Sequence, residues 1–292
     1  MSWLQLELET NQTHAEELST LLEQLGAISV SLTASSSEPV FDESDKDNTL
    51  WERTKLSVLL NSKCNIDNLL IQLHSHIGSN AIYSHNIKFL EDKDWVNEFK
   101  SKYQPIFFSN KICISPSWCE PSKNKITTIV LDPGLAFGTG AHPTTSLCIE
   151  WFCKNDINNK IVIDYGCGSG ILAMVAVKFG AKKVFAIDID EQALNTTREN
   201  IEQNKLQEKI LVCHPENAVI PKADILVANI LQNPLKKLLK KFSSLTKPGS
   251  HIILSGLLST QTKECLAAYR THFNMDEPVL RKSWASLHGV RL

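Results

Sequence analysis

The residues best suited to chemistry form the glycine-rich segment Asp164-Tyr165-Gly166-Cys167-Gly168-Ser169-Gly170, which follows a run of apolar residues. Alternate glycines let a backbone turn sharply and bring its N–H groups close to a bound ligand. A dinucleotide-binding loop would need a further glycine at position 171, where this chain has Ile171. The segment therefore disfavours NAD or FAD. Taken alone, it is compatible with a nucleoside site and with a structural turn.

A second candidate, Asp188, follows the apolar run 184–187, one strand and one helix after the glycines. A carboxylate in this place can accept hydrogen bonds from both hydroxyls of a ribose. The nearby Asp190 directly precedes a helix-forming segment, so we predict that it is a helix N-cap and makes no ligand contact. The glycine loop and Asp188 together indicate a nucleoside-containing ligand.

These candidates must be positioned by strands and helices that alternate from Lys160 onward. Such alternation implies right-handed crossovers and an α/β fold with a mostly parallel, doubly wound sheet. In these sheets ligands bind at the carboxyl ends of the strands, where Asp188 and Asn229 lie. The apolar periodicity predicts strands at 161–165, 183–187, 210–213, 223–228 and 251–254, and helices at 171–179, 191–203 and 234–245.

The first 90 residues follow a different pattern, with the order βαββαβ of a smaller, ferredoxin-like α+β unit. This part has no glycine loop, so we interpret residues 1–90 as a recognition domain. The charged segment 91–102 predicts a short linker helix, and residues 103–292 form the ligand-binding domain. Predicted strands lie at 3–8, 27–33, 50–60, 82–90, 106–108, 111–114 and 127–131, and predicted helices at 13–26 and 66–76.

The composition and charge of the chain limit the kinds of binding partner that it can attract. Hydrophobic residues make up 42% of the chain and charged residues 21%, which is ordinary for a globular protein. The net charge of -2 provides no general attraction to DNA or to an anionic membrane. The first 60 residues carry eleven acidic and three basic side chains. This excess is either a solvated acidic loop or a docking face for a basic partner.

Cysteine and histidine usage predicts neither disulfides nor a metal. Eight cysteines occur without a C-x-x-C pair, which fits reduced thiols in the cytoplasm. We expect Cys167 to be a small filler in its loop, and His74 and His76 have no identifiable further ligands. The chain also shows neither a signal peptide nor an apolar run long enough for a membrane span, and we expect a monomer.

The pattern D-x-G-x-G-x-G is typical of class I methyltransferases, in which this loop faces the methionine part of S-adenosylmethionine. The motifs LDPGLAFGTGAHPTTSLC (131–148), DYGCGSGILA (164–173), AIDID (186–190) and VANIL (227–231) together resemble the PrmA family. Its members methylate the eleventh protein of the large ribosomal subunit. The resemblance covers the whole chain, including its start WLQLEL and the linker sequence EDKDW.

This resemblance implies a Rossmann-like domain that binds S-adenosylmethionine and an N-terminal domain that docks the ribosomal protein. Thr145, Gly166, Asp188 and Asn229 would contact the cofactor, and Phe137 would belong to the loop that covers it. Pro143 fits the first turn of the helix that follows this loop. Family members trimethylate lysine side chains and the N-terminal α-amino group, so the expected enzyme is a protein-lysine N-methyltransferase.

Methyl transfer to nitrogen is an in-line displacement that needs a positioned, neutral amine. A lysine with a pKa of about 10.4 is protonated at neutral pH, so the site must favour the uncharged form. No residue is marked as the base. Asn229 can orient the nitrogen through its amide oxygen, although an asparagine after a strand is also an ordinary turn residue. The N-P-P-Y motif of other amino-methylating enzymes is absent, which counts against DNA adenine or glutamine amide as the substrate.

Two alternatives stay open at this point. One is an N-methyltransferase for another protein, an RNA or a small molecule. The other is a nucleoside-binding module that transfers nothing, against which the strand end at Asn229 and the loop around Phe137 both argue.

Overall fold

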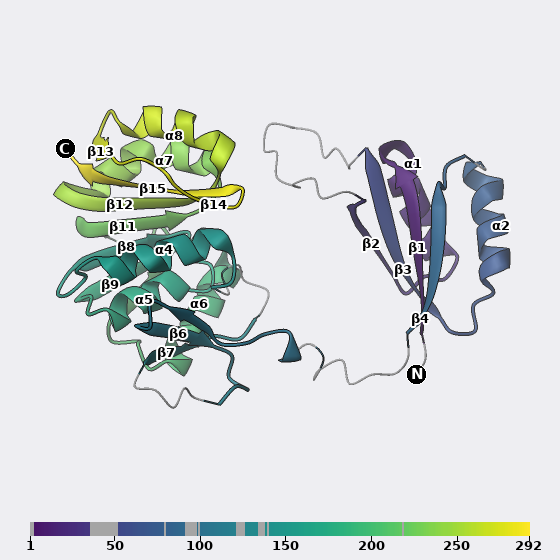
Figure 1. Cartoon of the computed structure of the whole chain (residues 1–292), viewed down its shortest axis with the longest axis horizontal. Helices are drawn as coiled ribbons and strands as arrows, with labels where there is room; N and C mark the ends of the chain where they lie inside the picture. Colours follow the sequence, from purple (N-terminus) through teal and green to yellow (C-terminus); the bar gives the residue numbers. More distant parts are fainter. Residues whose placement is uncertain are drawn as a thin grey trace. The chain divides into compact units, whose positions relative to one another are not determined.

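The chain forms two compact units, Met1–Glu98 and Phe99–Leu292, each with its own hydrophobic core (Figure 1). The division falls inside the segment 91–102, whose predicted helix lies largely outside the described residues. The computed structural model describes residues 3–35, 52–78, 80–90, 98, 100–120, 126–133, 138, 140–217 and 219–292.

The N-terminal unit is an antiparallel sheet with two helices on one face (Figure 1). Its strand order β2-β3-β1-β4 is the ferredoxin-like arrangement that the element order predicts. Alternate residues of β1 and β3, among them Leu6 and Val58, pack against Leu18 and Leu22 of α1. The elements are β1 (Trp3–Asn11), α1 (Gln12–Gln24), β2 (Ser29–Ala34), β3 (Arg53–Asn61), α2 (Ile66–Ile77) and β4 (Ser84–Leu90).

The opposite face of this sheet carries charged side chains that pair with one another. The Glu7 carboxylate lies 2.8 Å from the Lys88 ammonium and 3.0 Å from the Lys55 ammonium. These two hydrogen-bonded lysines lower the pKa of Glu7 to about 2. Glu9 accepts a hydrogen bond from the Ser84 hydroxyl at 3.1 Å. Two carboxylates of the acidic excess are therefore engaged within the sheet.

The C-terminal unit is built on an eight-stranded sheet of order β10-β9-β8-β11-β12-β15-β13, with β14 paired to β15. Strands β8 to β12 run parallel to one another, as the alternation predicts. β15 is antiparallel to both β12 and β13 and lies between them. The strands are β8 (Ile161–Tyr165), β9 (Lys183–Ile187), β10 (Ile210–Cys213), β11 (Ala223–Asn229), β12 (Thr246–Leu258), β13 (Phe273–Met275), β14 (Val279–Arg281) and β15 (Trp284–Arg291).

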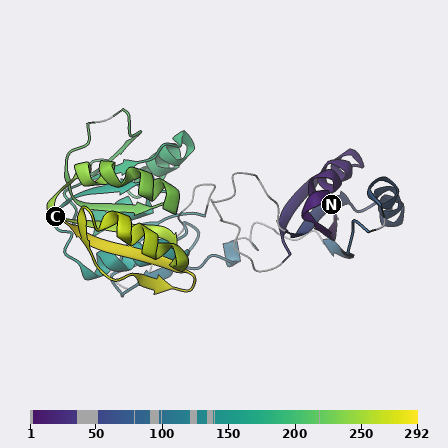
Figure 2. The ribbon, with the colours of Figure 1, turned by 90° about the horizontal axis from the view of Figure 1, so that it is seen from above.

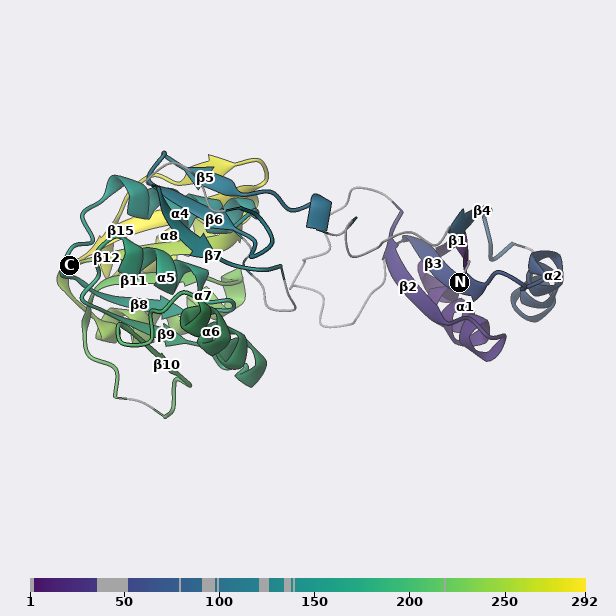
Figure 3. The ribbon, with the colours of Figure 1, turned by 90° about the horizontal axis from the view of Figure 1, so that it is seen from below.

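Helices cover both faces of this sheet, so the predicted doubly wound α/β class is confirmed. Alternate strand residues separate the two cores: Val162 packs with α4, α5 and α6, whereas Ile163 packs with α7 and α8. Figure 2 shows α7 and α8, coloured green to yellow, on one side, and Figure 3 shows α5 and α6 on the other. The helices are α4 (Pro143–Lys154), α5 (Ile171–Lys178), α6 (Glu191–Gln203), α7 (Gln232–Leu245) and α8 (Thr262–Tyr269), with the short 3-10 helix η1 (Ser259–Gln261) before α8.

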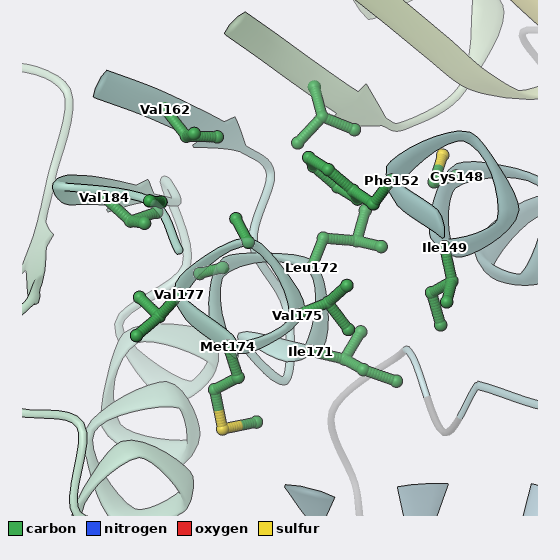
Figure 4. Close-up of a cluster of buried hydrophobic side chains, with 14 of the residues drawn as sticks. Cys148, Ile149, Phe152, Val162, Ile171, Leu172, Met174, Val175, Val177 and Val184 are labelled. Carbon is green, nitrogen blue, oxygen red and sulfur yellow. The ribbon is translucent and has the colours of Figure 1, made fainter. Parts of the chain in front are cut away.

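Helix α5 is buried on all sides because a second, three-stranded sheet packs against it. This sheet consists of β5 (Ile106–Phe108), β6 (Ile112–Ser115) and β7 (Thr127–Val130), and its apolar residues join the same core as α5. All residues from Ile171 to Val177 are buried. Figure 4 shows the side chains of Val175, Met174 and Val177 projecting from different sides of the helix. A helix that is apolar all round lies between packed layers. The glycine loop therefore leads into a rigidly held element.

The structure differs from the predicted elements mainly after Leu254. There it adds η1, α8 and the strands β13 to β15, for which the alternating pattern predicts no element. Strand β15 reverses direction and inserts between two strands that precede it in the chain. Its place depends on long-range pairing, which a local strand–helix alternation does not encode.

Candidate functional site

The glycine loop joins the carboxyl end of β8 to α5 and is tied to the neighbouring strand β9. The backbone N–H groups of Gly166 and Cys167 donate to the carbonyl oxygen of Ile187 at 2.7 and 3.0 Å. Gly166 has a φ of +78°, and a Cβ on it would lie 2.3 Å from Cγ2 of Ile230. Any other residue would meet both a left-handed backbone and a packed side chain, so this position requires glycine.

Two polar residues of α6 hold the carbonyl groups of this loop. The Thr197 hydroxyl donates to the carbonyl oxygen of Gly168 at 2.8 Å, and the Asn200 amide donates to that of Ser169 at 2.8 Å. No motif in the sequence marks these two residues. The signal that could have found them is their helical spacing with the buried Ile201, because polar side chains on a buried face need partners.

Asp188 lies beside the glycine loop, as the sequence predicts. Its Oδ2 accepts from the backbone N–H of Gly168 at 3.0 Å, and its Oδ1 accepts from that of Asp190 at 3.1 Å. Each carboxylate oxygen keeps a further lone-pair site, so the half-buried side chain is held in place and can accept two more donors. Asp190 accepts from the backbone N–H of Gln192 at 2.9 Å, which confirms that it is the N-cap of α6.

Asp164, near the end of β8, is fully buried and only partly hydrogen-bonded. Its Oδ2 accepts from the backbone N–H of Ala173 at 2.9 Å, whereas its Oδ1 has no hydrogen-bond partner among the described residues. Burial, and to a smaller degree the charge of Asp188, raises the pKa of Asp164 to about 7. A buried carboxylate oxygen without a partner needs a donor, which a bound water or a ligand can supply.

Asn229, the last residue of β11, contacts Thr145 in the first turn of α4. The Asn229 Nδ2 donates to the Thr145 Oγ1 at 3.2 Å, across 84 positions of sequence, and Thr145 is 0% exposed. The Asn229 Oδ1 is buried and has no partner in the part of the chain that the structure describes. Because β11 is paired with β8, Asn229 and Asp164 bring two unpaired acceptors to the same edge of the sheet.

Helix α4 begins at Pro143, as predicted, and His142 is its N-cap. The Nδ1 of His142 accepts from the backbone N–H of Thr144 and lies 2.7 Å from its hydroxyl oxygen. Burial lowers the pKa of His142, which favours the neutral form of the ring. The ring also packs edge-on against Trp284 of β15 at 4.8 Å between centroids. His142 therefore anchors the helix, and its Nδ1 is not available as a base.

The described residues of this unit give little support for a reactive thiol or a metal site. Burial raises the pKa of the Cys167 thiol, which keeps it protonated and unreactive, as expected for a small filler. No group of three or more His, Cys, Asp or Glu side chains that could hold a metal ion occurs among the described residues. Within the same residues, no helix combines the length and apolar character that crossing a membrane requires. Phe137 lies outside the described residues.

Known proteins resemble the chain over its whole length. It matches the family model described as ribosomal protein L11 methyltransferase (PrmA) over residues 2–292. It is 41% identical to the ribosomal protein L11 methyltransferase of Shewanella woodyi over 292 residues, which is 100% of both chains. It is 40% identical to that of Shewanella amazonensis over 294 residues, covering 100% of this chain and 99% of the relative. A solved structure, the ribosomal protein L11 methylase from Lactobacillus delbrueckii subsp. bulgaricus, has a TM-score of 0.58 and 32% identity, covering 65% of this chain and 99% of that one.

Proposed function

The chain belongs to the family of ribosomal protein L11 methyltransferases, and from this premise we propose that it transfers methyl groups from S-adenosylmethionine to amino groups of ribosomal protein L11. The observation that carries the proposal is the amide of Asn229. Thr145 holds its nitrogen, and its oxygen is buried and unpaired at the carboxyl edge of the sheet. Such an oxygen is an acceptor for the N–H of an amine.

The residues at this edge fit S-adenosylmethionine, which supplies a methyl group activated by its sulfonium. Asp188 offers its carboxylate to the two ribose hydroxyls, and we assign the backbone of the turn at Gly166, which packs against Ile230, to contact with the methionine part. The unpaired Oδ1 of Asp164 suits the α-ammonium of the methionine part. Thr145 and Asn229 complete the set of residues that we assign to the cofactor.

The chain's own contribution to the transfer is to orient a neutral amine. The Asn229 Oδ1 has two lone pairs, so it can accept an N–H of the amine as well as a donor from the cofactor. The buried surroundings of this atom disfavour an ammonium relative to a neutral amine. Because neither His142 nor Cys167 is suited to take the proton, we propose that it leaves to solvent before transfer.

The N-terminal unit is the part that we assign to docking of L11, with trimethylation of lysine side chains and of the N-terminal α-amino group as the outcome. Two observations support a docking role for this unit: it has a hydrophobic core of its own, and its helices leave one face of its sheet uncovered. Glu7 is neutralised by two lysines, but Glu16, Glu17 and Glu23 of α1 are exposed and acidic. An exposed acidic face attracts a basic partner.

We also place the reaction in the cytoplasm, because all eight cysteines are free, which fits a reducing compartment. Transfer to another protein, an RNA or a small molecule is less supported. The relatives that match the whole chain bear the name of L11 methyltransferases.

The test is transfer of labelled methyl groups from S-adenosylmethionine to purified L11. The wild-type chain is expected to label L11, and Asn229→Ala to lower the rate by about a hundredfold, because a misplaced amine loses its orientation. Asn274→Ala, a change to an exposed asparagine on β13, is the matched control and should keep the wild-type rate. If the wild-type chain binds the cofactor and L11 stays unlabelled, the proposal is wrong.

A further inference from the structure

A buried serine on β12, Ser255, links α4 to the end of β11. Its hydroxyl donates to the carbonyl oxygen of Thr144 at 3.1 Å. Its own carbonyl accepts from the backbone N–H of Ile230 at 3.1 Å, and Ser255 is the register partner of Asn229 in the parallel pair. One residue therefore contacts the chain directly before Thr145 and directly after Asn229.

The strand is shaped to bring Ser255 this close. The register between β12 and β15 shifts between Ser255 and Leu257, and the intervening Gly256 has a φ of +86°. A Cβ on Gly256 would lie 2.4 Å from the carbonyl oxygen of Ile230. Only glycine allows this approach, and a bulge of this kind re-aims the neighbouring side chain. Ser255 is 0% exposed.

We propose that Ser255 is a positioning residue for methyl transfer, which acts through Thr145 on the amide of Asn229. The inference rests on the proposed function. An asparagine amide that rotates by half a turn presents NH₂ in place of oxygen, and NH₂ would repel an incoming N–H. In the observed orientation the Asn229 Nδ2 donates to the Thr145 Oγ1, and this bond holds the plane of the amide with its oxygen turned away from Thr145. The Ser255 hydroxyl fixes the helical turn that carries Thr145.

Loss of this hydroxyl should disturb the first turn of α4 without undocking the helix. Farther along α4, the Arg281 guanidinium donates to the Glu150 carboxylate at 2.7 and 2.8 Å. Among the described residues, the Ser255 hydroxyl shares its one proton between the carbonyl oxygens of Thr144 and Ala285, and neither of these belongs to the glycine loop or to Asp188. Because Thr145 and Asn229 also belong to the residues assigned to the cofactor, the expected defect is a loss of turnover together with a smaller loss of cofactor affinity.

The experiment compares Ser255→Ala with Ser286→Ala in methylation of L11. Ser286 is the register partner of Ser255 on β15 and is also buried, at 7% exposed, so it is a matched control. Ser255→Ala should lower kcat by about tenfold or more, because small misplacements of reacting groups are costly. The rise in its cofactor Kd should be smaller than the fall in kcat, and Ser286→Ala should keep the wild-type kcat and cofactor Kd. A wild-type kcat for Ser255→Ala would overturn the inference.

A double-mutant cycle with Asn229→Ala separates positioning from a general structural role. If Ser255 acts through the amide, Ser255→Ala should change the single-turnover rate little once Asn229 is alanine. An equal loss in both backgrounds would refute the inference. If the alanine variant does not fold, Ser255→Cys keeps a similar volume with a weaker donor: a lowered kcat supports the inference, and a wild-type kcat refutes it. Failure of the wild-type chain to methylate L11 would instead contradict the proposed function.

Discussion

Asp164 is the residue through which pH should control cofactor binding, because burial raises the pKa of this carboxyl to about 7. An α-ammonium on its Oδ1 requires the carboxylate form, so binding is coupled to loss of the proton. We expect the affinity for S-adenosylmethionine to fall by up to about tenfold per pH unit below pH 7. Isothermal titration calorimetry between about pH 5.5 and 7.5, below the pKa of an α-amino group, measures this dependence.

The matched variant is Asp164→Asn, which removes the charge and keeps an acceptor for the N–H of Ala173. It should bind the cofactor more weakly than wild type at pH 7.5, with an affinity that hardly changes with pH. The same pH slope in both proteins would rule out Asp164 as the titrating group.

Asp164 should affect folding in the opposite direction. Its pKa in the folded chain is above the value of about 3.9 for an unfolded chain, so the stabilisation from this group is present below about pH 4. It is lost as the pH rises through about 7, on the order of a few kcal/mol for a fully buried group. Without cofactor, Asp164→Asn should therefore melt at a higher temperature than wild type at pH 8 and at a similar temperature near pH 4. Equal melting temperatures at pH 8 would contradict this account of the burial.

The turn from β8 into α5 offers a test at the scale of one element. Gly166 and Gly249 share a φ of +78°, but a Cβ on Gly166 would lie 2.3 Å from Ile230, whereas a Cβ on Gly249 has nothing within 4 Å. Gly166→Ala should cost about 1–3 kcal/mol of stability more than Gly249→Ala, because only Gly166 adds overpacking to the backbone strain. Gly166→Ala should also weaken cofactor binding by about tenfold or more. Denaturant unfolding and calorimetry of both variants measure the difference, and equal effects would argue against a tightly packed loop.

The local sequence pattern was sufficient to predict the strands and helices that carry the site. Strands β8 and β9 and helix α6 have the predicted bounds, because strand–helix alternation and the N-cap Asp190 are encoded within a few residues of each element. The contact between Thr145 and Asn229 spans 84 positions and depends on how α4 packs against β11, which no local pattern encodes. Family resemblance brought both residues into the predicted cofactor set without indicating that they touch.

Other parts of the site could not be predicted from local sequence patterns either, because they also depend on packing between distant segments. The roles of Ser255 and Thr197 depend on a bulge in β12 and on the packing of α6 behind the glycine loop. The carboxylates of Asp188 and Asp164 lie at strand ends that the fold brings together, but only the structure shows that an oxygen of Asp164 is buried and unpaired.

At the scale of the whole molecule, the two units have separate cores that share no residues. The residues that we assign to the cofactor all belong to Phe99–Leu292. Expressed alone, residues 99–292 are expected to bind S-adenosylmethionine within about threefold of the full chain and to lose about a hundredfold or more in kcat/KM for L11, because docking no longer raises the local concentration of substrate. Calorimetry and steady-state methylation measure the two effects. A C-terminal unit as efficient on L11 as the full chain would rule out a docking role for the N-terminal unit.

The most direct test of the central claim is mass spectrometry of ribosomal protein L11 from cells with and without this chain. We predict that L11 loses its methyl groups in cells that lack the chain, that the wild-type gene restores them, and that a gene encoding Asn229→Ala does not. L11 that carries the same methyl groups in both kinds of cells would contradict the assignment of this chain as its methyltransferase.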